Sequence, residues 1–235
     1  MGMPITIDIS DCNDESAFKP TFDRLRQIDE NFSTHKKDSE VSRFAAGQIA
    51  ESTLSSELKE VIKACREAEV KTGGYFSAWA GGKFNPSGYV KGWAIAQAGQ
   101  AIEKQGFKTY CIGAGGDILA RSDSDFEWKI GIQDPSDRSN ILNALSISNG
   151  AVATSGNYER GEHIINPKTG KPANEILSFS VTGPDIIKAD ILATAGFAAG
   201  KKSLELVEAV SDYEALAVYK DGSLVMSSGM SKLVA

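Results

Sequence analysis

The chain has 235 residues, of which 41% are hydrophobic and 24% are charged, ordinary values for a globular protein. Its formal net charge of -6 argues against a nucleic-acid-binding surface, which usually carries a basic patch. This length allows one domain or two intimately packed lobes around a sizeable core.

The N-terminal segment and the cysteines bear on the cellular compartment. Residues 1–8 have neither the basic nor the apolar region of a secretory signal. No apolar run approaches the roughly 18 residues that a membrane-spanning helix needs. The cysteines at positions 12, 65 and 111 are too scattered to predict a disulfide framework or a zinc site. We therefore expect a soluble, cytoplasmic protein that does not insert into membranes.

The first half of the chain reads as one strand followed by helices. Alternation of apolar and polar residues predicts a strand over 5–9. Apolar residues at helical spacing predict helices over 18–32 and around 58–65. Residues 32–44 lose this periodicity and predict a polar loop. A loop rich in glycine then leads into a third helix, over about 91–106.

The second half is richer in strands. Strand-like runs cover 109–112, 128–132 and 179–182, and an alanine-rich helix spans roughly 186–199. The segment 215–226 has the Asp-Gly signal of a β-hairpin. Because strands outnumber what strict βαβ alternation would give, we expect an α+β fold with a mainly antiparallel sheet.

Ser87, Gly88 and Lys91 stand directly before the third predicted helix. The free backbone N–H groups at a helix N-terminus favour anions, and Lys91 adds a positive charge in the same place. Taken alone, the segment is more typical of a loop-to-helix junction with a solvated lysine.

The run Gly113–Asp117 follows a strand and invites comparison with a dinucleotide-binding fingerprint. That fingerprint needs a third glycine and an opening helix, whereas residues 117–121 here continue as a strand. We therefore exclude a Rossmann motif. Gly115 and Gly116 either let the backbone approach a bulky ligand or form a tight turn.

The segment 153–170 combines hydroxyls, Arg160, His163, Asn-Pro and two glycines without helical or strand periodicity. Donors of this kind suit a polyanionic ligand. A long surface loop is the alternative interpretation, but such loops in compact domains are usually functional.

Asp190 and Thr194 are four residues apart on the alanine-rich helix, so a carboxylate and a hydroxyl share one face. Two hard oxygen ligands together with phosphate oxygens suit Mg²⁺, which seldom takes an all-protein cage. The alternative is an Asp that favours the helix dipole and a Thr that bonds back to the preceding turn.

Taken together and in this order, these segments resemble the ApbE family of FAD:protein FMN transferases. The shared motifs are Ser-Gly-x-x-Lys-Gly, Gly-Gly-Asp, Ser-Gly-x-Tyr, His-Ile-Ile-(Asp/Asn)-Pro-x-Thr-Gly and Ala-Asp-x-x-Ala-Thr. The polar stretch 32–44 is similar to a Ser-rich segment of the family, so the resemblance extends from there to about Gly200. The combination is specific, although no single motif is, and the short form without an export signal is similar to a cytoplasmic subgroup.

The resemblance implies a T-fold-like architecture in which residues 1–235 form a single domain of two packed lobes with FAD between them. It implies Mg²⁺-dependent transfer of FMN from FAD to a Thr or Ser hydroxyl of a target flavoprotein, with release of AMP. Asp190 and Thr194 are then Mg²⁺ ligands, with a backbone carbonyl from 88–91, and His163 is the candidate general base. The FAD site is lined by Ser87, Gly88, Lys91, Gly115, Gly116, Asp117, Ser155, Gly156, Tyr158 and His163.

Two positions depart from the pattern of the family, because Asn85 and Asn157 stand where Asp is common. Asn cannot contribute charge to a metal or act as a base. These departures keep two alternatives open: an FAD pyrophosphatase that gives FMN and AMP, and a flavin-binding module without catalysis. Asn166 also replaces an Asp, but we expect a polar rather than an ionic role there.

Overall fold

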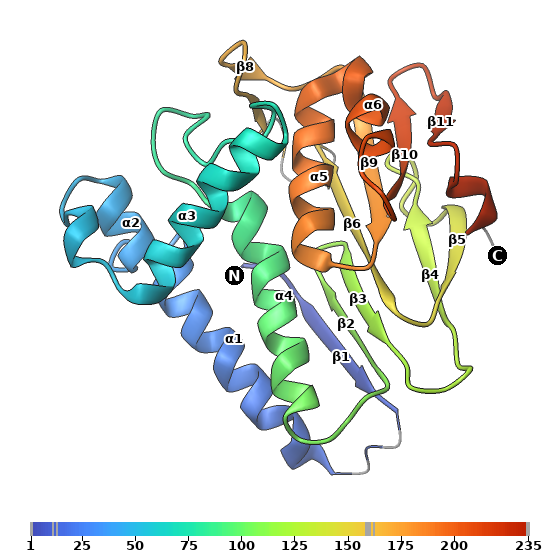
Figure 1. Ribbon diagram of the computed structural model, residues 1–235, viewed down its shortest axis with the longest axis horizontal. Helices are drawn as coiled ribbons and strands as arrows, with labels where there is room; N and C mark the ends of the chain where they lie inside the picture. Colours follow the sequence, from blue (N-terminus) through green and yellow to red (C-terminus); the bar gives the residue numbers. More distant parts are fainter. Residues whose placement is uncertain (1, 11, 13, 158–160, 162, 234–235) are drawn as a thin grey trace.

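Figure 1 shows the computed structural model, which describes residues 2–10, 12, 14–157, 161 and 163–233. Tyr158, one of the expected FAD-site residues, lies outside the described residues. The helices are α1 (Lys19–Phe32), α2 (Glu40–Ala45), α3 (Ser56–Lys71), α4 (Ser87–Glu103), α5 (Ile186–Ala199) and α6 (Ser203–Glu208). The strands are β1 (Ile5–Ile9), β2 (Tyr110–Ala114), β3 (Asp117–Arg121), β4 (Trp128–Gln133), β5 (Ile141–Ile147), β6 (Gly150–Gly156), β7 (Ile165–Asn166), β8 (Lys171–Pro172), β9 (Ile176–Gly183), β10 (Glu214–Tyr219) and β11 (Leu224–Met226).

A seven-stranded sheet forms the centre of the molecule, with strand order β1-β2-β3-β6-β9-β10-β11. All of its neighbouring strands are antiparallel. The pairs β4–β5 and β7–β8 form separate two-stranded ribbons. Helices together with a mainly antiparallel sheet confirm the α+β class that the sequence predicts.

The two faces of the central sheet are covered differently. Figure 1 shows α4 and α5 lying across one face, and residues of β6 such as Ala151 and Ala153 belong to the apolar core on that side. Val152, which points the other way, belongs to a smaller cluster with Ile130 and Leu145 of the β4–β5 ribbon. Alternate residues of one strand therefore serve two cores, as the pleat requires.

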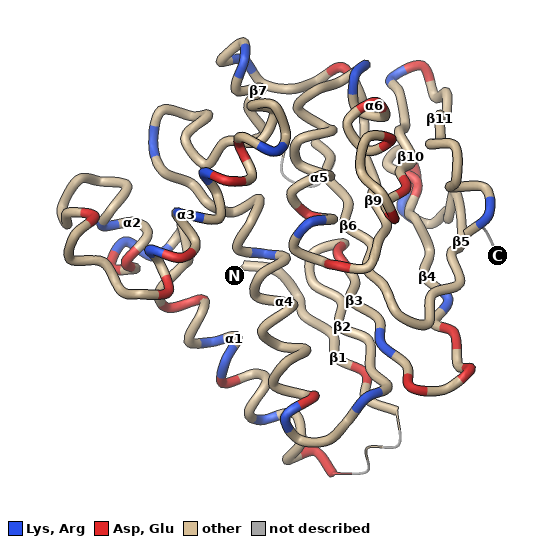
Figure 2. Tube along the Cα trace, viewed as in Figure 1, with Lys and Arg blue, Asp and Glu red and all other residues tan. Residues whose placement is uncertain are grey.

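Charge is distributed evenly over this architecture. Figure 2 shows basic and acidic residues interspersed along the helices and connecting loops rather than gathered on one element. None of the described helices combines the length and the apolar character that crossing a membrane would need.

Local signals located most elements correctly, and α5 coincides with its predicted range. The prediction was wrong for the start of the segment 153–170, because residues 153–156 belong to β6, a strand between β3 and β9. Most of β6 is buried on both faces, so the polar–apolar alternation that marks a half-exposed strand is absent. The polar loop predicted over 32–44 also contains the start of α2, whose N-cap Ser39 accepts a hydrogen bond from the Ser42 N–H.

Candidate functional site

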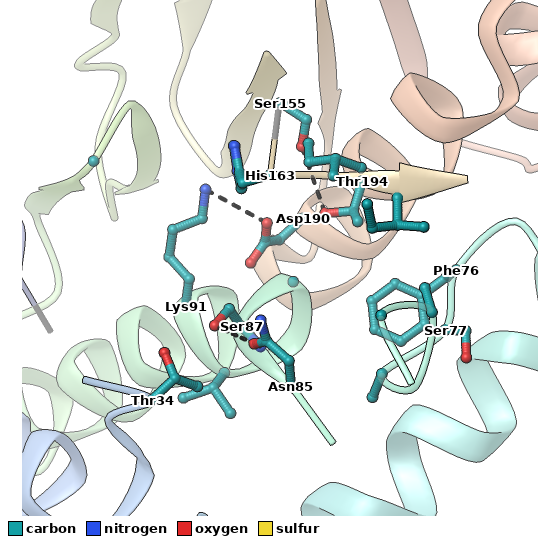
Figure 3. A pocket seen from close by; sticks show the side chains of 18 of the residues that line it. Thr34, Phe76, Ser77, Asn85, Ser87, Lys91, Ser155, His163, Asp190 and Thr194 are labelled. Carbon is teal, nitrogen blue, oxygen red and sulfur yellow. Dashed lines mark hydrogen bonds and ion pairs between the residues drawn. The ribbon is translucent and has the colours of Figure 1, made fainter. Parts of the chain in front are cut away.

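A pocket of about 250 Å³ lies where the helices and the central sheet meet. Its wall combines the end of α1, the loop after α3, the start of α4, the β2–β3 turn, the end of β6 and one face of α5. Figure 3 shows Lys91, Asp190, Thr194, Ser155 and His163 in one close-up view. The pocket therefore brings together members of all four sequence segments that carried the functional expectations.

Lys91 in the pocket wall lies between two carboxylates, of which Asp190 also lines the pocket. Lys91 Nζ lies 2.9 Å from Asp117 Oδ2 and 3.5 Å from Asp190 Oδ1. The Lys91 side chain is 17% exposed, and the side chains of Asp117 and Asp190 are 0% and 1% exposed. The Thr154 N–H donates to Asp117 Oδ1 at 3.1 Å, which fixes that carboxylate to β6. One ammonium thus lies beside two buried carboxylates.

Two glycines of α4 allow the close helix contact that creates this arrangement. A Cβ on Gly92 would lie 2.9 Å from the Ile186 carbonyl oxygen and 3.0 Å from Asp190 Cβ. A Cβ on Gly88 would lie 3.0 Å from Thr194 Oγ1. The Gly92 N–H donates to Asp190 Oδ2 at 2.8 Å, a bond across 98 positions of the chain. The spacing Ser-Gly-x-x-Lys-Gly therefore positions Lys91 between two points where α5 touches α4.

Burial dominates the electrostatics of Asp190. It raises the pKa of this carboxyl to about 7, with a further rise from the Asp117 carboxylate. The Lys91 ammonium and the Gly92 N–H oppose the rise because they stabilise the ionised form. A carboxylate that is costly to ionise in isolation is one that gains from a bound cation.

The residues present fit a divalent cation with few protein ligands. Ser155 Oγ and Thr194 Oγ1 lie 3.5 Å apart beside Asp190, so hydroxyl and carboxylate oxygens line the same part of the pocket. Within the described part of the chain, His, Cys, Asp and Glu form no cluster of three or more that could hold a metal. Mg²⁺ is commonly bound through one or two carboxylates plus substrate phosphates, whereas zinc or calcium sites need more protein ligands.

His163 lies at the exposed side of the same pocket. Its Nδ1 is 2.9 Å from the Gly161 carbonyl oxygen, which can only accept a hydrogen bond. Nδ1 is therefore the protonated nitrogen of the neutral ring, and Nε2 carries the free lone pair. The arrangement leaves an accessible basic nitrogen on a surface-exposed imidazole.

Gly115 and Gly116 form the tight turn between β2 and β3. Their φ angles of 55° and 87° lie in the left-handed region, as a two-residue type I′ hairpin requires, and Ala114 pairs with Asp117 across it. Gly115 lines the pocket, while Asp117 begins β3 and points its carboxylate at Lys91. The tight-turn interpretation is confirmed, and the turn also brings backbone to the pocket, while the approach of a ligand stays a prediction.

The segments that form this pocket lie within the part of the chain that matches a known protein family. A match to the ApbE family covers residues 1–85 and 77–217. The chain belongs to the ApbE family.

Relatives and solved structures of this ApbE family resemble the chain in sequence and in fold. An FAD:protein FMN transferase from Vibrio cholerae is 27% identical over 243 residues, covering 77% of this chain and 73% of that protein. One from Escherichia coli K12 is 30% identical over 142 residues, 55% of this chain. The matched segments span only 32% and 39% of the first relatives, from Klebsiella pneumoniae and E. coli.

Solved structures show that the fold is shared along nearly the whole chain. The ApbE protein from Thermotoga maritima superimposes with a TM-score of 0.86 at 22% identity, covering 99% of this chain and 96% of that one. The flavin transferase ApbE from V. cholerae gives a TM-score of 0.83 at 23% identity, with the same coverage of both chains. The architecture that the resemblance implied is thus the architecture of ApbE structures.

Several pocket residues were not singled out from the sequence of this ApbE protein. Thr34 and His35 enter the pocket from the loop after α1, and Tyr75, Phe76 and Ser77 enter it from the loop after α3. A signal existed for the first pair, because only two histidines occur in the chain and both line this pocket. For the second group the sequence offered only a glycine pair after a helix.

The asparagines that depart from the ApbE pattern make structural hydrogen bonds. Asn85 Oδ1 accepts from the Ser87 N–H at 3.1 Å and from its hydroxyl at 2.6 Å, at the start of α4. Asn157 Nδ2 donates to the Ala173 carbonyl at 2.8 Å. An Asp at position 157 has no proton to donate when ionised, so the amide suits this contact.

Asn166 has a polar, structural environment of the kind expected from the sequence. Its Nδ2 donates to the Ala198 carbonyl at the end of α5 at 2.8 Å. Its Oδ1 accepts from the Lys168 N–H at 2.9 Å. The side chain therefore connects the β7–β8 turn to α5.

Proposed function

We propose that this protein is an FAD:protein FMN transferase. It moves the FMN part of FAD onto a Thr or Ser hydroxyl of a target flavoprotein through a phosphoester bond and releases AMP. The observation that carries the proposal is the group of Lys91, Asp190 and the buried Asp117, beside a pocket that Lys91 and Asp190 line together with Thr194 and His163. The names of the ApbE relatives support the same activity.

The proposed metal site uses Asp190 and Thr194 as Mg²⁺ ligands. A backbone carbonyl from 88–91 completes the protein ligands. The Gly88 carbonyl is the best placed, because the Gly92 N–H that would bind it in a regular helix also donates to Asp190. When bound, Mg²⁺ neutralises the negative charge that develops on the pyrophosphate oxygens.

The chain's own residues bind and orient FAD around this centre. Asp117 holds the Lys91 ammonium, which stabilises the charge of the phosphate oxygens. We propose that the remainder of FAD is contacted by backbone and hydroxyl groups of seven residues: Ser87, Gly88, Gly115, Gly116, Ser155, Gly156 and Tyr158.

His163 acts as the general base. Its Nε2 takes the proton of the acceptor hydroxyl while the hydroxyl oxygen attacks the phosphorus of the FMN moiety. The bond from that phosphorus to the bridging oxygen breaks, and AMP leaves with the electron pair. Atoms and charges balance without a further reactant.

The proposal places the protein in the cytoplasm, as a single domain over 1–235. Its two lobes are the helices α1–α4 and the central sheet with α5, and the FAD site lies between them. Because residues from both parts line the pocket, each part is needed to complete the site.

A direct test incubates the protein with FAD and Mg²⁺, with and without a small flavoprotein domain that carries an Asp-(Ser/Thr)-Gly-Ala-(Ser/Thr) acceptor motif. We expect AMP by chromatography and an acceptor heavier by one FMN in its intact mass. Asp190→Ala abolishes the Mg²⁺-dependent transfer, and full transfer by this variant contradicts the metal assignment.

The same experiment separates the alternatives. Free FMN and AMP without modification of the acceptor identify a pyrophosphatase that uses water, to which the exposed His163 imidazole is accessible. FAD that binds and stays intact with both Mg²⁺ and acceptor identifies a binding module.

A further inference from the structure

Tyr75 lies in the wall of the pocket, and the C-terminal cap of α3 fixes its segment. The Gly74 N–H donates to the Glu69 carbonyl at 2.8 Å, and the preceding residue, Gly73, has a φ of 58°. This long return bond and left-handed residue are typical of a Schellman-type cap. The Thr72 hydroxyl accepts from the Phe76 N–H at 3.0 Å. Hydrogen bonds on both sides thus hold the backbone that carries the ring.

Lys168 stands on the turn between β7 and β8, which is anchored to α5. Asn166 binds this turn twice, through Oδ1 to the Lys168 N–H and through its carbonyl to the Gly170 N–H, both at 2.9 Å. The same side chain donates to the Ala198 carbonyl of α5 at 2.8 Å. The turn is therefore part of the sheet-and-α5 side of the pocket.

The two segments meet through a cation–π contact. Lys168 Nζ lies 4.1 Å from the centre of the Tyr75 ring, well inside the roughly 6 Å range of such contacts. Figure 1 shows the β8 hairpin beside the end of α3 that leads into this loop. A Cβ on Gly74 would lie 3.9 Å from Lys168 Cε, an ordinary van der Waals distance, so the Lys168 side chain runs close to this cap. The contact joins the α3 side of the pocket to the α5 side.

We propose that Lys168 is a positioning residue that holds the Tyr75 ring as an aromatic wall for one of the two flat ring systems of FAD. This assignment rests on the proposed function, since FAD is the ligand. A fixed aromatic ring stacks on a flat ligand ring at lower entropic cost than a free one. Lys168 acts through Tyr75, so its effect requires the ring.

The test measures the Kd of FAD, FMN and ADP by titration without acceptor, together with KM and kcat of transfer. Lys168→Met weakens FAD binding roughly two- to fivefold, and Tyr75→Leu weakens it at least as much. The loss recurs with FMN if the isoalloxazine stacks on Tyr75, and with ADP if the adenine does. Lys168→Arg and Tyr75→Phe restore the affinity because they keep the cation and the ring. Lys171→Met, on the same hairpin, is the matched control.

Coupling between the two residues decides the outcome. The double variant Lys168→Met/Tyr75→Leu binds FAD no more weakly than Tyr75→Leu alone, and the changes occur in Kd and KM rather than in kcat. Additive losses overturn the proposal, as does wild-type affinity in Lys168→Met. Equal losses for FMN and ADP with a lowered Tm also overturn it, because they indicate a merely structural contact.

The failure of this assignment is distinguishable from failure of the proposed function. If the wild type binds FAD but yields neither AMP nor a modified acceptor, the transferase proposal fails while the Kd series still tests Lys168. If the wild type transfers FMN and Lys168→Met binds FAD normally, only the positioning role fails. Absence of FAD binding by the wild type overturns both.

Discussion

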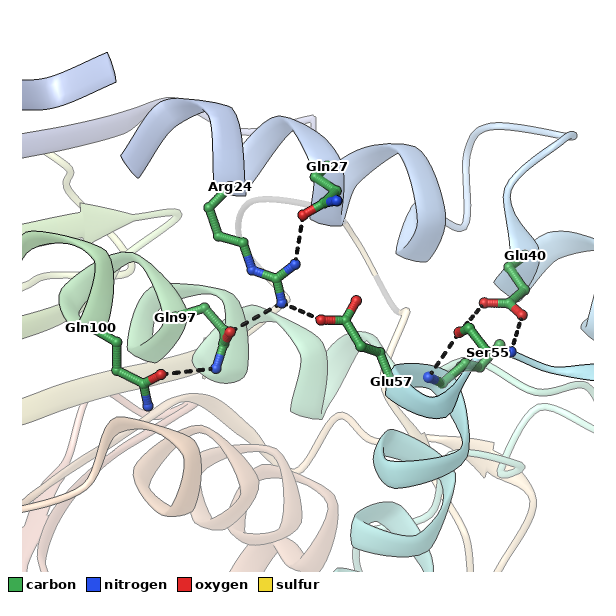
Figure 4. A network of polar contacts seen from close by, with 8 residues as sticks. Arg24, Gln27, Glu40, Ser55, Glu57, Gln97 and Gln100 are labelled. Carbon is green, nitrogen blue, oxygen red and sulfur yellow. Dashed lines mark hydrogen bonds and ion pairs between the residues drawn. The ribbon is translucent and has the colours of Figure 1, made fainter. Parts of the chain in front are cut away.

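Two networks of charged and polar side chains connect the helices of this protein, and they differ in burial. At the pocket, Lys91 lies between the carboxylates of Asp117 and Asp190, which are 0% and 1% exposed; Figure 3 shows Lys91 beside Asp190. On the outer side of the helices, Arg24 donates to Glu57 at 2.5 Å and to Gln97 at 3.0 Å (Figure 4). Those side chains are more accessible, with Arg24 20% and Glu57 39% exposed.

In the outer network one cation, Arg24, pairs with one carboxylate, Glu57, and neutral amide oxygens accept its other hydrogen bonds. Arg24 also donates to Gln27 at 2.8 Å, and Gln97 donates to Gln100 at 3.3 Å. It connects α1, α3 and α4 at a surface where water screens the ion pair. Among the described residues, the inner group has two almost fully buried carboxylates for one ammonium. A buried excess of negative charge is costly for folding, and a bound cation can offset it.

The largest effect that separates the two networks comes from removing the shared ammonium. Lys91→Met leaves two buried carboxylates without their cation, so we expect a loss of about 3 to 5 kcal/mol in the free energy of unfolding. Denaturant unfolding followed by tryptophan fluorescence measures it. If the free energy of unfolding falls by less than the loss caused by removing an exposed ion pair, water already reaches the inner group.

Gly92→Ala tests whether close helix packing creates the inner group. The new methyl group meets the Ile186 carbonyl oxygen at 2.9 Å, so α4 must move away from α5 and Asp190 shifts. We expect about 1 to 3 kcal/mol of destabilisation and at least a tenfold loss of transfer, of the size seen when the surroundings of a metal ligand are disturbed. Equal transfer rates for the variant and the wild type would contradict the role of this contact.

The pH dependence of stability reports the burial of Asp190. Its pKa is raised from the ordinary value of 3.8 to about 7, so the folded metal-free protein binds more protons than the unfolded chain between these values. Stability from this group therefore falls as pH rises from about 4 to about 7. In EDTA, we expect the Tm of the wild type relative to Asp190→Asn to fall by roughly 3 °C or more between pH 5 and pH 8. A constant difference would contradict the raised pKa.

The smallest effect belongs to the outer network. Glu57→Gln removes the charge of one partner at a partly exposed site, and the amide can still accept from Arg24. We expect a loss below about 1 kcal/mol in stability and no change in transfer. Unfolding and transfer assays run beside Lys91→Met provide the comparison. A loss as large as that of the inner variant would remove the distinction between the two networks.

The sequence by itself determined the elements with strong local signals and the membership of the site. The alanine-rich helix 186–199 and the Asp-Gly hairpin could be predicted because helix spacing and turn chemistry are short-range properties. The ordered motifs indicated the ApbE family and named Lys91, Asp117 and Asp190 as members of one site.

The tertiary structure alone decided how these residues meet. The strand β6 went unrecognised because burial on both faces removes its alternation, and its place between β3 and β9 depends on long-range pairing. Lys91 lies between carboxylates from β3 and α5 because Gly92 lets two helices approach, a contact with no local periodicity. The contact of Tyr75 with Lys168 has the same origin, since burial and partner choice emerge only when separate segments pack.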